Sequence, residues 1–146
     1  MSFVSKWEVI VRWAECDPAG IVYYPQFFRW FDGAAWAYFQ NGGLPMEDMM
    51  REFDSFGMPL VDAHCTFRTP ARWGDTLTFS TRVVRWGHKS FEMEHKAHIG
   101  ERLVAEGTEV HVWGVRDPED RNRLRAGPIP EFVKEHFRKL DAESDG

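Results

Sequence analysis

Residues 17–32 read Asp-Pro-Ala-Gly-Ile-Val-Tyr-Tyr-Pro-Gln-Phe-Phe-Arg-Trp-Phe-Asp, a polar turn that leads directly into an apolar helix. The first four residues are typical of a tight turn. An Asp side chain accepts hydrogen bonds from the backbone that follows it, Pro fixes φ, and Gly tolerates positive φ. Pro25 suits the first turn of a helix, where its missing N–H is no loss. The sequence Asn41-Gly42-Gly43 is a stop signal, so we expect a helix from Pro25 to about Gln40.

This predicted helix is apolar around most of its circumference. One face carries Phe27, Phe31, Ala34, Ala35 and Tyr38, and the other sides carry Phe28, Trp30, Trp36 and Phe39. A surface helix has one apolar stripe, whereas a helix that is apolar on nearly every side is buried. Its ~16 residues span about 24 Å. Because Arg29 and Asp32 also interrupt it, the helix does not fit a membrane span. We therefore expect a central helix that other elements enclose.

Alternation of apolar and polar residues predicts strands before and after this helix. The expected ranges are 6–13, 60–68, 76–86, 89–99 and 103–115, with a hairpin at Gly100-Glu101. Helical spacing predicts a short helix over 45–53 and an amphipathic helix over 131–140, and we expect a charged loop at 117–123 and a frayed tail at 142–146. One strand, a buried helix and four further strands indicate an α+β fold. In it, an antiparallel sheet of about five strands wraps around the central helix.

The composition is that of a folded globular chain. With 146 residues, 43% of them hydrophobic and 15% aromatic, the chain is expected to form a single domain over residues 1–146. The net charge of −5 opposes nucleic-acid binding and offers no long-range attraction for an anionic ligand. We find no apolar run typical of a signal peptide or a membrane span, and so expect a cytoplasmic protein without membrane insertion.

The cysteines and histidines do not form a pattern that predicts a metal centre. Cys16 and Cys65 are expected to be free thiols, as in most cytoplasmic proteins. The six histidines are scattered, and neither cysteine belongs to a Cys-x-x-Cys pair. Glycine-rich nucleotide-binding motifs and a Gly-x-Ser-x-Gly elbow are also missing from the sequence. The sequence therefore predicts neither a metal nor a cofactor.

Asp17 is the candidate catalytic residue. It precedes the helix by a few residues, and the free N–H groups and positive dipole at a helix start stabilise an oxyanion. A carboxylate there can attack a carbonyl as a nucleophile or activate water as a base. The residues alone also allow Asp17 only to shape the Asp-Pro turn. Cys16 has no histidine in a recognisable partner position and is expected to be structural.

Residues 17–32 resemble the signature of the 4-hydroxybenzoyl-CoA thioesterase family of hotdog-fold enzymes. The resemblance continues in the expected order through Trp86-Gly-His-Lys-Ser-Phe91 and Arg123-Leu-Arg-Ala126, so it covers most of the chain. The Asp-Pro-Ala-Gly-Ile-Val segment before an aromatic-rich helix is its most specific part. The resemblance implies a hotdog fold, which agrees with the fold expected from the residue pattern, and it implies hydrolysis of an acyl-CoA thioester.

The resemblance also implies roles for five residues. Asp17 matches the family's essential carboxylate, and Tyr24 matches the position whose backbone N–H polarises the thioester carbonyl. Lys89 and Ser90 match a segment that contacts a CoA phosphate, and Arg125 matches an arginine that contacts the CoA nucleotide across a subunit interface. Members of the family are homo-oligomers, commonly dimers of dimers. Association is also expected from the residue pattern, because a single five-stranded sheet leaves open edges.

Other charged residues are expected to be structural. His88 departs from the basic pattern of the family in the Lys89 segment, so no CoA contact is assigned to it. Arg121 and Arg123 lie near the acidic residues of the charged loop, which they can neutralise. Glu109 and His111 share one face of the last strand and are expected to pair with each other.

The sequence thus predicts an acyl-CoA thioesterase that releases a carboxylic acid and CoA, with an aromatic acyl group similar to 4-hydroxybenzoyl as the leading substrate. One alternative within the fold is a thioesterase for short-chain aliphatic acyl-CoA. A second alternative, from another class, is a non-catalytic module that binds CoA or an acyl carrier. Asp17 argues against the second alternative, because binding alone does not require that carboxylate.

Overall fold

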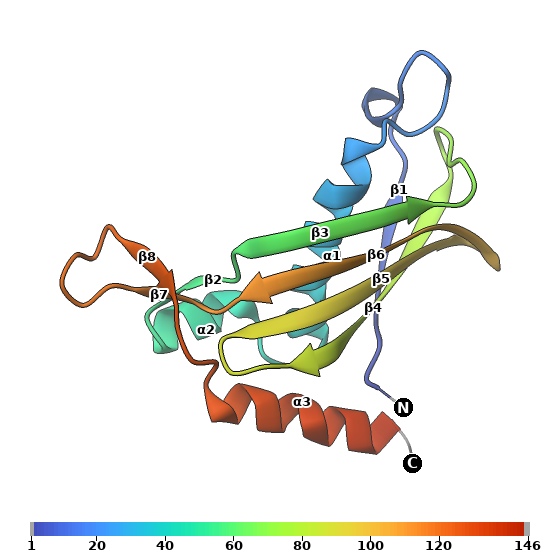
Figure 1. The fold of residues 1–146 in the computed structure, drawn as a ribbon. Coiled ribbons are helices and arrows are strands. Elements are labelled where there is room, and N and C mark those ends of the chain that lie inside the picture. The colour runs from blue at the N-terminus through green and yellow to red at the C-terminus, as the bar shows by residue number, and fades with distance from the viewer. Residues whose placement is uncertain (1, 145–146) are drawn as a thin grey trace.

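The computed structural model describes residues 2–144. A five-stranded antiparallel sheet has the order β1-β4-β5-β6-β3. Its strands are β1 (Ser5–Ile10), β3 (Leu60–Phe67), β4 (Thr76–Trp86), β5 (Ser90–Ile99) and β6 (Arg102–Val112). Helix α1 (Pro25–Asn41) packs across one face of this sheet (Figure 1). The expected α+β arrangement of five antiparallel strands with a central helix is confirmed.

Helix α1 forms the centre of the core. It ends at Asn41, and the following Gly43 has φ +87, as the stop signal predicts. Two glycines let α1 approach the sheet closely. A Cβ at Gly107 of β6 would lie 2.4 Å from the Phe31 ring, and a Cβ at Gly33 would lie 2.5 Å from Trp7. The buried residues of α1 are Phe27, Trp30, Phe31, Ala34, Ala35, Tyr38 and Phe39.

Strand β4 connects the two ends of the molecule. Leu77, Phe79, Thr81 and Val83 point inward and are buried, as their alternation predicts. At one end Thr76 pairs with Ile10 of β1, and at the other Trp86 pairs with Phe91 of β5. The predicted hairpin after β5 is also present, with Gly100 at φ +60.

Strand β3 is an outer strand of the sheet, and its side chains are unusually exposed. Leu60, Val61 and Phe67 are 51%, 63% and 48% exposed, respectively. A long edge strand with apolar side chains is a site for association with another chain.

The first strand is shorter than predicted. Trp13 lies in the 3-10 turn η1 (Trp13–Glu15) rather than on the inner face of β1, and it is 72% exposed. The chain leaves the strand because the Arg12 N–H donates to the Glu15 carboxylate at 2.7 Å instead of to a neighbouring strand. The exposed Trp13 ring meets Trp73 edge to face, with ring centroids 5.3 Å apart.

The last predicted strand is divided in two. Strand β6 ends at Val112, and β7 (Gly114–Arg116) pairs instead with β2 (Ser55–Gly57) and β8 (Leu124–Ala126) in a separate three-stranded sheet. The break lies at Trp113, which is 1% exposed and fills the core between the two sheets. The charged loop at 117–123 is therefore the tip of the β7–β8 hairpin, which extends from the body of the molecule (Figure 1).

The two shorter helices agree with the sequence patterns in place but not fully in length. Helix α2 (Met46–Glu52) contacts β2, and helix α3 (Glu131–Ser144) buries Val133 and Phe137. The expected frayed tail is wrong for residues 142–144, which continue α3, and residues 145–146 lie outside the described residues. No helix within residues 2–144 is long and apolar enough to cross a membrane.

Candidate active site

The Asp17 turn forms as the sequence predicts. The Gly20 N–H donates to the Asp17 carbonyl at 2.9 Å, and the Ala19 N–H donates to Asp17 Oδ1 at 2.8 Å. Gly20 has φ +80, which favours glycine. The turn closes when the Asp17 N–H donates to the Ile21 carbonyl at 2.9 Å. One carboxylate oxygen of Asp17 therefore holds the turn, and the other oxygen is available for chemistry.

The start of α1 presents a free hydrogen-bond donor. Within residues 2–144, no acceptor takes the Tyr24 N–H, whereas the N–H groups of Tyr23, Gln26 and Phe27 are all bonded. Pro25 has no N–H, so Tyr24 is the donor at this end of the helix. An unpaired N–H at a helix start is suited to bind a carbonyl oxygen that becomes negative.

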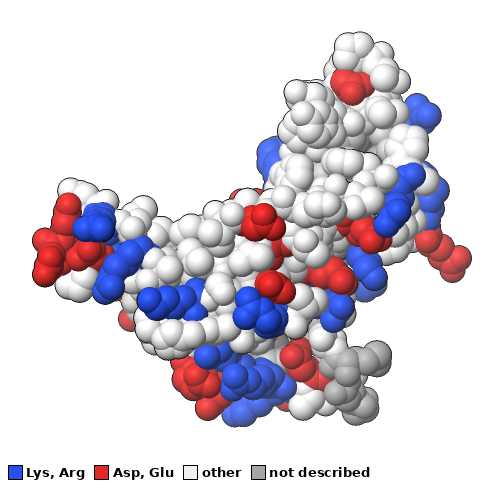
Figure 2. All heavy atoms as spheres, viewed as in Figure 1, with Lys and Arg blue, Asp and Glu red and all other residues white. Residues whose placement is uncertain are grey.

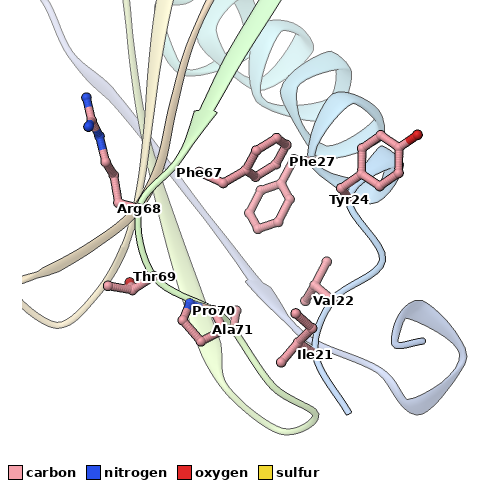
Figure 3. A pocket seen from close by; sticks show the side chains of 9 residues that line it. All are labelled: Ile21, Val22, Tyr24, Phe27, Phe67, Arg68, Thr69, Pro70 and Ala71. Carbon is pink, nitrogen blue, oxygen red and sulfur yellow. The ribbon is translucent and has the colours of Figure 1, made fainter. Parts of the chain in front are cut away.

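An apolar cavity of about 360 Å³ lies beside Tyr24. Figure 3 shows the Phe27 and Phe67 rings side by side in it, in an edge-to-face contact, while the Tyr24 hydroxyl and the Arg68 side chain point away. The cavity lies between the start of α1 and the end of β3. The remaining lining residues are Ile21, Val22, Thr69, Pro70 and Ala71.

Asp17 itself lines a neighbouring depression of about 440 Å³, together with Cys16, Gly20 and the exposed pair Trp13 and Trp73. The two hollows are formed by consecutive parts of one segment, because Gly20 lines the depression and Ile21 lines the apolar cavity. The segment 17–24 therefore carries the carboxylate, the free N–H and one wall of an apolar cavity.

The three residues predicted to contact CoA lie close to one another at a different place. Lys89 precedes β5, Ser90 is its first residue, and Arg125 lies in β8. The Trp113 backbone connects them, because its N–H donates to the Lys89 carbonyl at 2.8 Å and its carbonyl accepts the Gly127 N–H at 2.9 Å. Lys89 and Arg125 are exposed. Figure 2 shows basic side chains mixed with acidic ones on the β7–β8 arm and along α3.

One chain does not bring its two groups of predicted site residues together. The Asp17 segment pairs with residues near the start of β4, since the Val22 N–H donates to the Ala71 carbonyl and the Val11 N–H donates to the Asp75 carbonyl. The Lys89 turn follows the other end of β4. The eleven residues of that strand separate the two ends by about 34 Å at ~3.4 Å per residue.

Sequence reasoning missed most of a buried polar network beneath α1. The His95 Nε2 lies 2.7 Å from Glu109 Oε1, and the His111 Nε2 lies 3.3 Å from the same oxygen. The expected pairing of Glu109 with His111 is thus confirmed, and His95 joins it from β5. Burial alone would raise the pKa of Glu109, but hydrogen bonds from His111 and His95 lower it to about 2. Burial and the Glu109 charge raise the pKa of Asp32 on α1.

The other candidates have structural partners. The Arg121 guanidinium pairs with Asp54 at 2.7 Å, and Arg123 lies 3.9 Å from Asp117. Cys16 and Cys65 are free thiols, and burial raises the pKa of the Cys65 thiol to about 11. Among the residues that the structure describes, no cluster of three or more His, Cys, Asp or Glu side chains could hold a metal ion.

The chain is similar to known thioesterases. Residues 11–137 match the Thioesterase-like superfamily. The chain is 35% identical over 126 residues to the 4-hydroxybenzoyl-CoA thioesterase of Pseudomonas sp. (strain CBS-3), covering 82% of this chain and 87% of that enzyme. It is 29% identical to the 1,4-dihydroxy-2-naphthoyl-CoA hydrolase of Synechococcus sp. (strain CC9605), covering 93% and 89% of the two chains.

The solved structure of the Pseudomonas sp. strain CBS-3 enzyme superposes with a TM-score of 0.82 at 33% identity, covering 91% of this chain and 98% of that one. The predicted hotdog fold is therefore confirmed. The chain belongs to the Thioesterase-like superfamily, and the resemblance to 4-hydroxybenzoyl-CoA thioesterase seen in residues 17–32 extends over most of its length.

Proposed function

We propose that this protein is an acyl-CoA thioesterase that hydrolyses an aromatic acyl-CoA, similar to 4-hydroxybenzoyl-CoA, to a carboxylic acid and CoA. The observation that carries the proposal is the placement of the Asp17 carboxylate and the unpaired Tyr24 N–H on one short segment, next to an apolar cavity. The named activities of the similar enzymes, which act on aromatic acyl-CoA esters, support the same substrate class.

In the proposed reaction, the Tyr24 N–H binds the thioester carbonyl oxygen and stabilises the negative charge that develops on it. Asp17 acts in one of two ways. As a nucleophile it attacks the carbonyl carbon, expels the CoA thiolate and forms a mixed anhydride, which water then hydrolyses. As a general base it takes a proton from water, whose oxygen attacks the carbonyl carbon, and the proton passes to the leaving sulfur. Both routes release the acid and CoA.

The apolar cavity beside Tyr24 is our candidate for the acyl group. Its Phe27 and Phe67 rings can contact an aromatic acyl ring edge to face. A short aliphatic acyl group would leave part of the 360 Å³ cavity unfilled, so it would gain less from burial. The alternative of a binding module that lacks catalysis is disfavoured by the free carboxylate oxygen of Asp17, which such a module would not need.

We further propose that each site is shared between two subunits of a homo-oligomer, a dimer of dimers. Lys89, Ser90 and Arg125 lie too far from Asp17 along β4 to act on the same CoA thioester within one chain. Antiparallel pairing of two exposed β3 edges would place the Asp17 end of one chain near the Lys89 end of the other. We also propose that the chain is one domain and acts in the cytoplasm.

The substrate proposal is tested by measuring thiol release from a panel of aromatic and short aliphatic acyl-CoA esters. We expect the highest kcat/KM for an aromatic hydroxy-acyl ester. A preference for short aliphatic esters would select the alternative within the fold, and binding of CoA without thiol release from any ester would select the non-catalytic alternative.

The shared site is tested by mixing two defective proteins, Asp17→Asn and the double variant Lys89→Ala/Arg125→Ala. After denaturation and joint refolding at equal amounts, half of the dimers contain one chain of each kind, and one of their two sites has all its residues. We therefore expect about one quarter of the parent activity at low substrate concentration. If the mixture is no more active than the sum of its parts, the site lies within one chain.

A further inference from the structure

Glu15 is a buried carboxylate that lies two residues before Asp17. It is 7% exposed, and charged side chains are rarely buried to this degree unless they are paired. Its Oε1 accepts the Arg12 N–H at 2.7 Å, and its Oε2 accepts a hydrogen bond from the Arg29 guanidinium on α1. Its backbone carbonyl accepts the Tyr23 N–H at 2.9 Å. Glu15 therefore binds the chain before the Asp17 turn, the chain after it and the helix itself.

These contacts leave the Asp17 turn little freedom relative to α1. Between Glu15 and Tyr23 the loop is closed by the bridge between Cys16 and Val22 and by the hydrogen bond from Asp17 N–H to the Ile21 carbonyl. The base of the loop is thus fixed at Glu15. Any change in the position of Glu15 moves Asp17 relative to the Tyr24 N–H.

Arg29 is held in a defined orientation on the helix. Its Nε donates to Gln26 Oε1 at 2.9 Å, while another nitrogen of the same guanidinium bonds Glu15. The planar guanidinium therefore spans two partners at once, a geometry that a lysine cannot reproduce. Because the Arg29 side chain is 63% exposed, the ion pair is screened by water and adds little to stability. The ion pair therefore matters more for the position in which it holds Glu15 than for the free energy it contributes.

We propose that Glu15 and Arg29 are positioning residues for the reaction, which set the place of the Asp17 carboxylate relative to the Tyr24 N–H. This inference rests on the proposed function, because it requires that Asp17 be catalytic. A displacement of a reacting group by about 1 Å can cost on the order of 10²-fold in rate. The pair should therefore affect turnover more than substrate binding.

The variants that test this are Glu15→Gln, which keeps the size of the side chain but removes its charge, and Arg29→Lys, which keeps the charge but removes the planar fork. We expect kcat to fall by roughly 10- to 100-fold in both, with KM within about threefold of the parent. The matched control is Glu94→Gln, which breaks the Arg82 pair (3.0 Å) on the outer face of the sheet. That control should keep kcat within about twofold.

A second readout separates positioning from a general loss of structure. Amide hydrogen exchange of residues 16–24 should become faster in Glu15→Gln, while exchange in β4 and β5 stays at the parent rate. Faster exchange in β4 and β5 as well would mean that Glu15 supports the whole fold, and it would overturn the inference.

The decisive comparison uses the Asp17→Asn background. If Glu15 acts through Asp17, adding Glu15→Gln to Asp17→Asn should lower kcat by less than about twofold more. A further loss as large as that in the parent background would overturn the positioning role. If Asp17→Asn is inactive and Glu15→Gln keeps the parent kcat, only this inference fails. If Asp17→Asn itself stays active, the proposed chemistry fails and the inference fails with it.

Discussion

Glu109 should contribute strongly to stability at neutral pH through its buried hydrogen bonds. It is 2% exposed, and two histidines lie within 3.3 Å of its Oε1. The His111 Nδ1 also lies 2.9 Å from the Met58 carbonyl, and the His95 Nδ1 lies 2.8 Å from the Thr81 hydroxyl. Each ring is therefore held between Glu109 and a second polar partner.

The size of the effect follows from the pKa of Glu109, which falls from 4.5 to about 2 in the folded chain. At 1.36 kcal/mol per pKa unit, ionised Glu109 contributes about 3 kcal/mol to the free energy of unfolding. Since the folded pKa is depressed, this contribution is fully present above pH 4.5 and is lost as the pH falls toward 2. The Glu109→Gln variant lacks it at every pH.

The assay is urea unfolding followed by tryptophan fluorescence, at one protein concentration and at several pH values from 7 to 3. We expect Glu109→Gln to unfold with a free energy about 3 kcal/mol below the parent at pH 7, and the difference to shrink steadily below pH 4.5. The control is Glu106→Gln, on the same strand as Glu109, which breaks a half-exposed pair with Arg68 and should change little. A difference below about 1 kcal/mol at pH 7, or one that stays constant down to pH 3, would refute the reasoning.

Three further predictions concern the site and the assembly. Asp17→Asn should remain folded while kcat falls at least ~10²-fold, as measured by thiol release; activity within about tenfold of the parent would contradict its catalytic role. Lys89→Ala and Arg125→Ala should chiefly raise KM for acyl-CoA. Because both side chains are exposed, each variant should lose about 1.5 kcal/mol of binding free energy, which raises KM roughly tenfold. An unchanged KM at low salt would remove these residues from the site. Light scattering should give a mass well above the 17.1 kDa of one chain at micromolar concentration, and a monomer would exclude the shared site.

The parts of the fold that the sequence predicted correctly are those with strong local signals. Helix α1 combines Pro25 at its start, glycines after its end and apolar residues on nearly every side. The side chains of strand β4 alternate between exposed or half-buried and buried from Thr76 to Val83, which identifies the face that is buried. Both elements carry enough periodicity in their own residues to determine their type and orientation without reference to the rest of the chain.

The small sheet could not be predicted in the same way. Strands β2, β7 and β8 have three residues each, too few for a period to be recognised. The break between β6 and β7 lies within a continuous strand-like pattern, and it depends on where Trp113 meets the core. The predicted strand is divided because β7 pairs with β8, which follows it in a hairpin, and with β2 from an earlier part of the chain.

The residues of the candidate site could be proposed from the sequence, but their geometry could not. Asp17 and Tyr24 were found from a sequence signature, yet the free N–H of Tyr24 is a property of the folded backbone and of the bonds made by its neighbours. His95 was missed because its link to Glu109 depends on the register of β5 against β6. Glu15 was missed because its burial depends on a helix residue fourteen positions away.

The two buried carboxylates, Glu15 and Glu109, differ in what their partners allow them to do. Glu109 is enclosed by histidines that are themselves at most 2% exposed, so water does not screen its interactions and their loss must appear in the stability of the chain. Glu15 is also buried, but its partner Arg29 is 63% exposed, so the ion pair contributes little free energy. A weak pair that joins both ends of the Asp17 loop to α1 is better explained by the position it enforces than by the stability it adds. Substitutions at Glu109 should therefore change unfolding first, and substitutions at Glu15 should change turnover first.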